Sequence, residues 1–217
     1  MAPRELKPAS IFDRRVVLRA FEENGIKDVH AHRMWRHLIH KGVTNFAKIP
    51  DMPKRAVELL EKEFSIRTTK LVKATESNDQ STTKLLLELQ DGHRVETVIM
   101  RYGSHCLASF PEDYLRKTEE GEVVFKGSKR ATVCVSSQVG CQMGCTFCAT
   151  GTMNLIANLT AGEILEQLYV ANQYEKIRNV VFMGMGEPLD NYESVVGAIQ
   201  GMKDVRWFSL RGQRISL

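Results

Sequence analysis

Three cysteines stand close together in a chain that contains five. Cys141, Cys145 and Cys148 have the spacing C-x3-C-x2-C in the segment GCQMGCTFCATG, residues 140–151, and no cysteine follows them in the sequence. In a reducing compartment, clustered cysteines bind metal or do redox chemistry more often than they form disulfides, and their odd number also argues against a disulfide framework. The segment therefore predicts a metal site.

Two kinds of metal site are compatible with these thiols. Structural zinc takes four ligands, and Cys134 could be the fourth, although it stands in an apolar run where strand alternation sets its direction. A [4Fe–4S] cluster held by three cysteines leaves one iron open, and S-adenosylmethionine (SAM) can bind that iron through its amino and carboxylate groups. Electron transfer then yields a 5′-deoxyadenosyl radical. The spacing resembles the signature of radical SAM enzymes, and Phe147 matches the aromatic residue found there.

A second motif stands in VVFMGMGEPLDN, residues 180–191. It puts Gly184, Gly186, Glu187 and Pro188 at the end of a predicted strand. Ligands of α/β sheets bind at the carboxyl ends of strands, so both motifs are predicted to open on the same edge. The glycines let a ligand approach the backbone, and Glu187 can accept hydrogen bonds from an ammonium group. Alone, the motif could be a turn that starts a helix; together, the two motifs favour the cluster over zinc.

The elements that would position these motifs alternate between strand and helix from residue 131 to the end. Strands are predicted at 131–137 and 179–186, helices at 159–174 and 193–202, and a third strand begins at 214. Thr160 and Glu163 form a predicted capping box at the start of the first of these helices. The alternation predicts an α/β fold with parallel strands joined by right-handed crossovers.

The preceding part of the chain has a different character. Apolar residues at helical spacing predict helices at 13–24, 30–42 and 53–64, which together form a small helical bundle. Residues 82–100 predict a β-hairpin that turns at Asp91-Gly92. Residues 103–130 are predicted to be a connection with one short strand at 122–125, in which Cys106 has no role. The predicted domains are a helical accessory domain at 1–70, the hairpin and connection at 71–130, and the α/β core at 131–217.

Composition and charge narrow the class of protein. Of the 217 residues 43% are hydrophobic, which predicts a buried core, and neither an 18-residue apolar run nor a signal-type segment is found in the sequence. We therefore expect a soluble, cytoplasmic protein without a membrane partner. The net charge of +4 is concentrated in residues 1–70, which contain 15 Lys or Arg and 9 Asp or Glu. This surplus would suit a nucleic-acid partner, although on charge alone a solvated helical face is the more usual explanation.

The sequence resembles the RlmN/Cfr family of RNA methyltransferases. The resemblance is carried by RVETVIM, RATVCVSSQVGCQMGCTFCATG, NLTAGEILEQ and NVVFMGMGEPLDNY, from about residue 90 to the end. The helical first third also looks like that family's N-terminal accessory domain. The closer branch is the one that methylates C2 of an adenine in large-subunit ribosomal RNA (rRNA) and in certain transfer RNAs (tRNAs).

This resemblance implies a role for each matching residue. Three cysteines would hold the [4Fe–4S] cluster: Cys141, Cys145 and Cys148. SAM would contact Gly186 and Glu187. Glu96, in RVETV, would accept the proton that leaves the adenine ring, and Cys134 would be the thiol that resolves a protein–RNA intermediate. The implied partners are rRNA, tRNA and an electron donor of the flavodoxin or ferredoxin type.

The sequence also departs from the family pattern. In the family, a methyl-carrying cysteine and a Ser-Thr stretch that contacts SAM stand further downstream than Leu217, and the connection at 103–130 is longer here than usual. We therefore expect an incomplete radical SAM partial (βα)6 barrel, preceded by the helical domain and the hairpin, in a chain truncated at its C-terminus. Two alternatives remain: an iron–sulfur or RNA-binding fragment without catalytic turnover, and a radical enzyme of a different reaction.

Overall fold

The computed structural model describes residue 4 and residues 6–102, 115–117, 123–125 and 130–217. Most of the predicted connection at 103–130 lies outside these residues, and so does Cys106. Within the connection, β6 (Leu115–Lys117) pairs antiparallel with β7 (Val123–Phe125), and β7 confirms the strand predicted at 122–125 over three of its residues.

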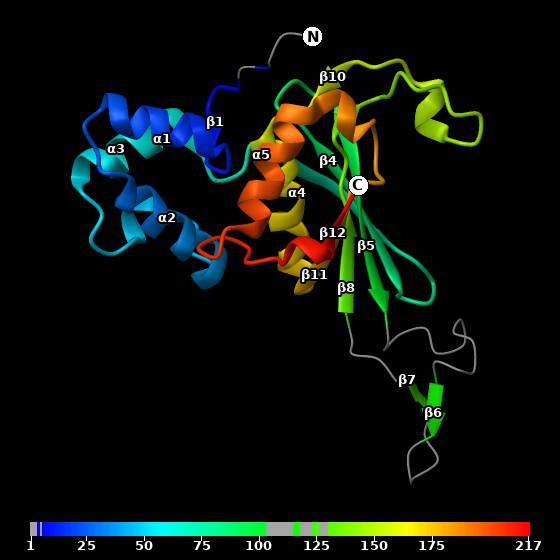
Figure 1. Cartoon of the computed structure of the whole chain (residues 1–217). Coiled ribbons are helices and arrows are strands. Elements are labelled where there is room, and N and C mark those ends of the chain that lie inside the picture. The colour runs from blue at the N-terminus through cyan, green and yellow to red at the C-terminus, as the bar shows by residue number, and fades with distance from the viewer. Residues whose placement is uncertain (1–3, 5, 103–114, 118–122, 126–129) are drawn as a thin grey trace.

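A six-stranded mixed sheet is the central element (Figure 1). Its strands stand in the order β12-β11-β8-β5-β4-β3. Along the chain they are β3 (Lys70–Glu76), β4 (Thr82–Glu88), β5 (Arg94–Tyr102), β8 (Arg130–Cys134), β11 (Ile177–Val181) and β12 (Ile215–Ser216). The pairs β12–β11 and β11–β8 are parallel, whereas the pairs β8–β5, β5–β4 and β4–β3 are antiparallel.

The predicted hairpin and the predicted α/β core share this sheet. The hairpin is confirmed as β4 and β5, and β5 pairs with β8 through Val98 opposite Cys134. Strand β3, which the sequence analysis did not predict, extends the sheet at the far edge of the hairpin. Two short pairs complete the strands: β1 (Ala9–Ser10) with β2 (Phe64–Ser65), and β9 (Gln138–Val139) with β10 (Ala157–Asn158).

Two helices cover one face of the sheet (Figure 1): α4 (Ala161–Tyr174) and α5 (Tyr192–Lys203). The capping box predicted for α4 is confirmed, because Thr160 Oγ1 accepts from the Glu163 amide at 3.1 Å and the Glu163 carboxylate accepts from the Thr160 amide at 2.9 Å. Every residue of α4 from 162 to 171 is buried. A helix buried all round needs partners on both sides, and the sheet supplies one side.

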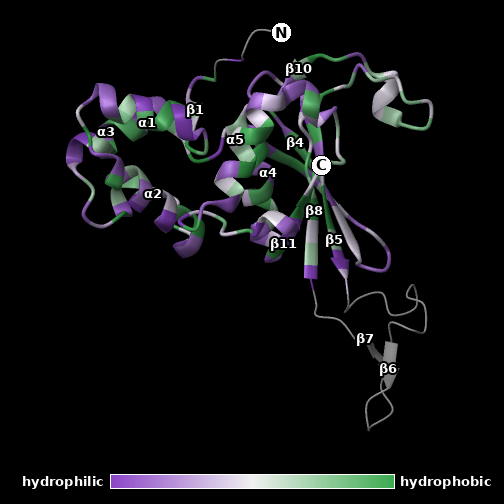
Figure 2. Ribbon diagram, in the orientation of Figure 1, coloured by the Kyte–Doolittle hydropathy of each residue, from purple (hydrophilic) through white to green (hydrophobic). Residues whose placement is uncertain are grey.

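The other side of α4 is covered by the N-terminal region, which contains α1 (Arg14–Glu23), α2 (Asp28–Lys41) and α3 (Lys54–Glu63). The three helices confirm the predicted ones with small changes at their ends, and Figure 2 shows hydrophobic and hydrophilic residues side by side on them. The indole of Trp35 in α2 lies 4.4 Å, between ring centroids, from that of Trp207 after α5. Phe12 packs on Tyr169 of α4 at 5.0 Å. These contacts make one continuous hydrophobic core.

Buried polar side chains on α4 fix this arrangement. The carboxylate of Glu166, which is fully buried, accepts hydrogen bonds from the Ser10 hydroxyl at 2.6 Å and from the amides and hydroxyls of Thr68 and Thr69 at 2.8 to 3.1 Å. The carboxylate of Glu163 is paired with the Arg4 guanidinium at 2.9 Å. A buried carboxylate is tolerated when it is surrounded by donors, as here.

The observed sheet and its covering helices confirm the α/β class. The partial (βα)6 barrel and the domain boundaries at residues 70 and 130 stay predictions. Among the helices of the described part of the chain, none has the length and hydropathy needed to cross a bilayer.

Candidate active site

The cysteine segment folds into a tight loop after β9. Gly140 has φ +74°, and a Cβ at this position would collide with the backbone oxygen of Asn154. A Cβ on Gly151 would come within 2.7 Å of the Cys145 oxygen. The loop is closed by hydrogen bonds from the Cys148 amide to the Cys145 oxygen at 3.1 Å and from the Gly151 amide to the Cys148 oxygen at 3.0 Å. Glycine is therefore required where the chain approaches itself.

The three thiols of this loop are free and reach solvent to different extents. Cys145 is exposed, and Cys141 and Cys148 are half-buried. The described residues contain no group of three or more His, Cys, Asp or Glu side chains close enough to hold a metal ion, so the thiols do not converge in the structure as it stands. Their chemistry still fits an iron–sulfur cluster, because soft thiolates select such clusters and zinc, and all three belong to one loop that solvent reaches.

The second motif lies against the segment that follows β8. A Cβ on Gly184 would come within 2.7 Å of the Val135 oxygen. Gly186 has φ +96°, and a Cβ there would collide with the side chain of Gln138. Both glycines are therefore needed for close contact between two stretches of backbone, whatever ligand they also meet.

Hydrogen bonds join the second motif, at the carboxyl end of β11, to residues 136–138, which lead from β8 into the cysteine loop. The Met185 oxygen accepts from the amides of Ser137 and Gln138 at 2.9 and 3.1 Å, and the Met185 amide donates to the Ser136 hydroxyl at 2.9 Å. The Glu187 amide donates to Gln138 Oε1 at 2.8 Å. Asn191, buried, donates from Nδ2 to the backbone oxygens of Ser137 and Leu159 at 2.8 Å each. The two predicted motifs thus form one structural unit.

Sequence reasoning gave no role to Ser136, Gln138 or Asn191. All three are polar and stand directly after a strand or within the second motif, in segments that the resemblance already included. Their burial beside the end of a sheet is the signal that could have identified them, since a buried polar side chain needs hydrogen-bond partners.

One oxygen of the Glu187 carboxylate accepts a hydrogen bond within its own turn. Glu187 Oε1 accepts from the Leu189 amide at 3.1 Å and so caps a short 3-10 helix, Pro188–Asn191. Within the described residues, Glu187 Oε2 accepts no hydrogen bond, so it can accept one from a ligand. At the end of this turn, Asp190 Oδ2 accepts from Gln142 Nε2 of the cysteine loop at 2.8 Å.

Glu96 and Cys134 share the face of the sheet that α4 and α5 leave uncovered. On β5 the buried residues Val95, Thr97 and Ile99 alternate with Glu96 and Val98, and Val98 stands opposite Cys134 on β8. Residues opposite each other in a sheet point to the same side, and diagonal neighbours such as Glu96 and Cys134 have Cα atoms about 7 to 8 Å apart. The strands therefore bring these two predicted residues together.

Each of the two has a defined environment. Glu96 is paired with Lys84 Nζ at 3.0 Å, and its backbone oxygen accepts from the Ser136 hydroxyl at 2.6 Å. Burial raises the pKa of the Cys134 thiol above its ordinary value, and a hydrogen bond from the Met183 backbone offsets part of this increase. Cys134 is therefore a protonated thiol at neutral pH.

Large apolar side chains are exposed on both motifs. Phe147 is 91% exposed and Met183 is 76% exposed, and Met143 and Leu189 are also exposed. Apolar side chains gathered on loops at one edge of a sheet indicate a surface that meets a ligand or partner.

Comparisons with known proteins extend this picture. A family model described as "Radical SAM superfamily" matches residues 135–214. A probable dual-specificity RNA methyltransferase RlmN 2 of Opitutus terrae is 34% identical over 97% of this chain and 52% of its own length. A ribosomal RNA large subunit methyltransferase N of Nitrosopumilus maritimus is 39% identical over 82% of this chain and 47% of its own. The chain thus spans about half the length of the curated relatives it matches.

A solved structure is similar as well. The crystal structure of a radical SAM methyltransferase from Sphaerobacter thermophilus superimposes with a TM-score of 0.74 and 28% sequence identity. The superposition covers 96% of this chain and 56% of that chain. It therefore includes the helical region and the hairpin as well as the part that the family model matches.

Proposed function

Since the chain belongs to the RlmN family of radical SAM proteins, we propose that it acts in RNA methylation, at C2 of an adenine in rRNA and tRNA. The single observation that carries this proposal is the junction of the two motifs, where Met185 is hydrogen-bonded to the segment that leads into the cysteine loop and Gln142 of that loop donates to Asp190 of the second motif. An electron donor of the flavodoxin or ferredoxin type and a cytoplasmic location belong to the same proposal, as does the partial (βα)6 barrel.

The proposed cofactor site is built from both motifs. The thiols of Cys141, Cys145 and Cys148 would hold a [4Fe–4S] cluster, and Gly186 and Glu187 would contact SAM. When bound, the two together would supply an adenosyl radical. The free Oε2 of Glu187 would accept a hydrogen bond from the ammonium group, and the glycine backbone would allow SAM to approach closely.

The proposed chemistry on the RNA uses the uncovered face of the sheet. The Glu96 carboxylate would take the proton that leaves the adenine ring, with Lys84 orienting it through the 3.0 Å ion pair. As the resemblance implies, the Cys134 sulfur would attack the sulfur of the cysteine that is cross-linked to the RNA: a disulfide would form, the bond between that sulfur and the RNA-bound methylene carbon would break, and its electron pair would pass to the adenine. That attack needs the thiolate, so the Cys134 proton must move to a base when the cross-link is present.

The proposal is tested by anaerobic reconstitution with iron and sulfide, followed by iron counting and electron paramagnetic resonance with and without SAM. A four-iron cluster whose spectrum shifts with SAM is the expected result. Cys145→Ser should lose the cluster, whereas Cys134→Ser should keep it, because its thiol stands on β8 and not in the loop. Bound zinc, or a cluster whose electron paramagnetic resonance spectrum is unchanged by SAM, would refute the proposed cofactor site.

Methyl transfer itself is tested by incubating the reconstituted chain with SAM, a reductant and rRNA or tRNA, and then analysing RNA nucleosides by mass spectrometry. 2-Methyladenosine is the expected product of a chain that also has the methyl-carrying cysteine; residues 1–217, which contain no cysteine after Cys148, are expected to give a SAM-responsive cluster without this product. A SAM-responsive cluster without any methylated nucleoside from a chain that has this cysteine would instead favour a binding module without turnover.

A further inference from the structure

A basic cavity lies at the edge of the sheet opposite the cysteine loop. It has a volume of about 800 Å³ and is formed where the ends of α2 and α4, the start of β11 and the segment before β12 meet. Five of its lining residues are basic: His40, Lys176, Arg178, Arg211 and Arg214. No carboxylate is found among the lining residues in the described part of the chain. The cavity is therefore suited to an anion.

The positive charge of this cavity is not neutralised by neighbours. Within the described residues, its lysine and three arginines form no ion pair. The two carboxylates adjacent to it along the chain are engaged elsewhere: Glu175 with Arg101 at 2.7 Å and Asp204 with Arg206 at 2.9 Å. Unpaired cations from separate segments, gathered at one concave site, produce a local positive potential that attracts polyanions.

The floor of the cavity is rigid. Trp207 and Leu168 are fully buried beneath it, and the Trp207 ring packs on Trp35 at 4.4 Å. One cationic side chain is also held in place, since Arg214 Nη1 donates to Asn179 Oδ1 at 3.2 Å. Side chains that are already held in place lose little conformational entropy when they bind a ligand.

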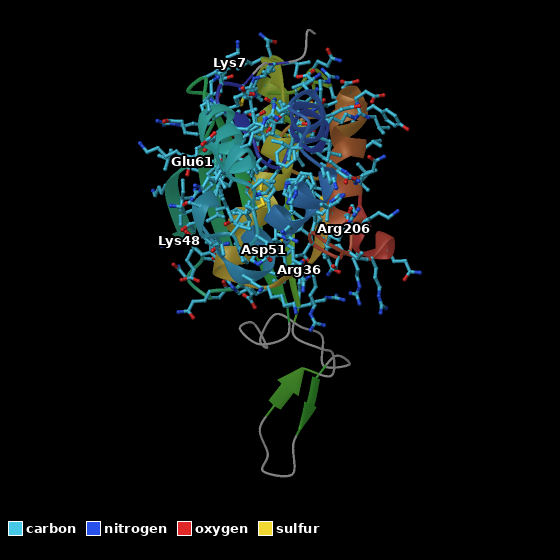
Figure 3. All side chains as sticks on the ribbon, turned by 90° about the vertical axis from the view of Figure 1, so that its left-hand side faces the viewer. Lys7, Arg36, Lys48, Asp51, Glu61 and Arg206 are labelled. Carbon is cyan, nitrogen blue, oxygen red and sulfur yellow. The ribbon has the colours of Figure 1, made fainter. Side chains whose placement is uncertain are left out.

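Further positive charge continues from the cavity over the helical side of the molecule. Figure 3 shows Arg36 and Arg206 on this side; Arg206 is paired with Asp204 at 2.9 Å, so the charge that is added here is that of Arg36, which is exposed. Arg36 stands one turn before His40 on α2, and Arg206 directly precedes Trp207. The basic surface thus spans the helical region and the α/β core.

We propose that this cavity, lined by Lys176, Arg178, Arg211 and Arg214, binds phosphates of the RNA backbone away from the reacting adenine. The identity of the partner rests on the proposed function. A strand of five residues such as β11 measures about 17 Å, which is the scale of the separation between the cavity at its start and the second motif at its end. Since phosphates recur about every 3.4 Å along a duplex strand, an RNA that contacts both must extend about five base pairs or more beyond the adenine, and the cavity favours such an RNA over an isolated loop.

The test compares two double variants that remove equal charge. Lys176→Ala/Arg211→Ala removes cations of the cavity, and Lys54→Ala/Lys62→Ala removes two exposed lysines of α3, which line neither the cavity nor the uncovered face of the sheet, as the matched control. Fluorescence anisotropy measures binding of a full-length tRNA transcript and of a short hairpin containing the adenine loop, across a salt series. For the cavity variant we expect about tenfold weaker tRNA binding and a log–log salt slope smaller by about 2, with hairpin binding unchanged.

The other outcomes overturn the inference. Equal losses in both variants would mean that only overall charge matters, and no loss in the cavity variant would mean that the RNA does not reach the cavity. If tRNA binding is unchanged but reduction of the cluster by flavodoxin slows, the occupant is an acidic protein. If the wild-type chain binds no RNA while its cluster responds to SAM, the proposed RNA substrate fails together with this inference.

Discussion

The hydroxyl of Ser136 bridges the second motif and strand β5: it accepts from the Met185 amide at 2.9 Å and donates to the Glu96 oxygen at 2.6 Å. Ser136 is fully buried. One side chain thus sets the position of the loop proposed to bind SAM relative to the carboxylate proposed to accept a proton. Such a buried bridge is costly to remove, because both of its partners lose a hydrogen bond.

We expect Ser136→Ala to lower the free energy of unfolding by about 2 kcal/mol, since it leaves the buried Met185 amide and the partly buried Glu96 carbonyl without this partner. Urea denaturation measures this. The matched control is Ser137→Ala: the Ser137 hydroxyl is buried but has no hydrogen-bond partner in the described residues, so its loss should change stability by less than about 0.5 kcal/mol. Equal effects of the two substitutions would contradict the bridging role.

Gly186→Ala should disable the second motif. At φ +96° an alanine is strained, and its Cβ would collide with Gln138, so the loop must move. We expect SAM affinity, measured by isothermal titration on the reconstituted chain, to fall by at least about tenfold, which corresponds to 1.4 kcal/mol. Gly212→Ala is the control, because its nearest neighbour would be a lysine side-chain atom at 3.8 Å. Unchanged affinity in Gly186→Ala would show that the loop tolerates a side chain.

Glu166→Gln should destabilise the whole chain. The buried carboxylate accepts from three residues, and an amide in its place would turn one donor group toward other donors. We expect the free energy of unfolding to decrease by about 3 kcal/mol, in the range for hydrogen bonds to a charged group. Thermal melts measure this. In the same melts Glu193→Gln, which breaks an exposed ion pair with Arg15 at 3.4 Å, should lower the free energy of unfolding by less than about 0.5 kcal/mol. Similar melting temperatures for the two variants would exclude a special role for Glu166.

Stability should fall at alkaline pH because of Cys134. Its pKa is raised by burial, so the folded chain keeps the thiol proton at a pH where the unfolded chain has already lost it. The stabilising contribution is therefore complete below the unfolded thiol pKa of about 8.5 and is lost as the pH rises through the higher folded value. Denaturation of the cluster-free chain between pH 7 and pH 10 should show a steeper decline for the wild type than for Cys134→Ser. Parallel curves would mean that this thiol is not perturbed.

Much of the fold could be predicted because local signals and tertiary contacts agree. The glycine that ends α2, Gly42 at φ +62°, and the capping box of α4 are local chemistry that the structure retains. Strand β3 could not be predicted, since KLVKATE contains three charged residues and does not alternate between apolar and polar residues. It forms because it pairs with β4, which is a tertiary contact. Strand β11 begins at Ile177, two residues earlier than predicted, where the side chain of Asn172 accepts from its amide.

The motifs of the candidate site could be predicted from the sequence, whereas the contacts between them could not. The two glycine-containing segments were identified from residue types at strand ends, whereas the pairing of Met185 with Ser136 and Ser137 depends on how β8 and β11 stand side by side. The shared face of Glu96 and Cys134 required the pairing of β5 with β8, which strand prediction does not give. Hydrogen-bond partners far apart in sequence were the part that only the structure could supply.

The burial of α4 determines how its backbone amides can become exposed to solvent by local unfolding. Amides in the middle of this helix are covered by the sheet on one side and by residues of the first 70 on the other, and Glu166 ties Ser10, Thr68 and Thr69 to it. No partial opening of the helical region can expose them without breaking those bonds. In native-state hydrogen–deuterium exchange, the backbone amides of Leu165 to Val170 should therefore be among the slowest in the chain and exchange through global unfolding alone.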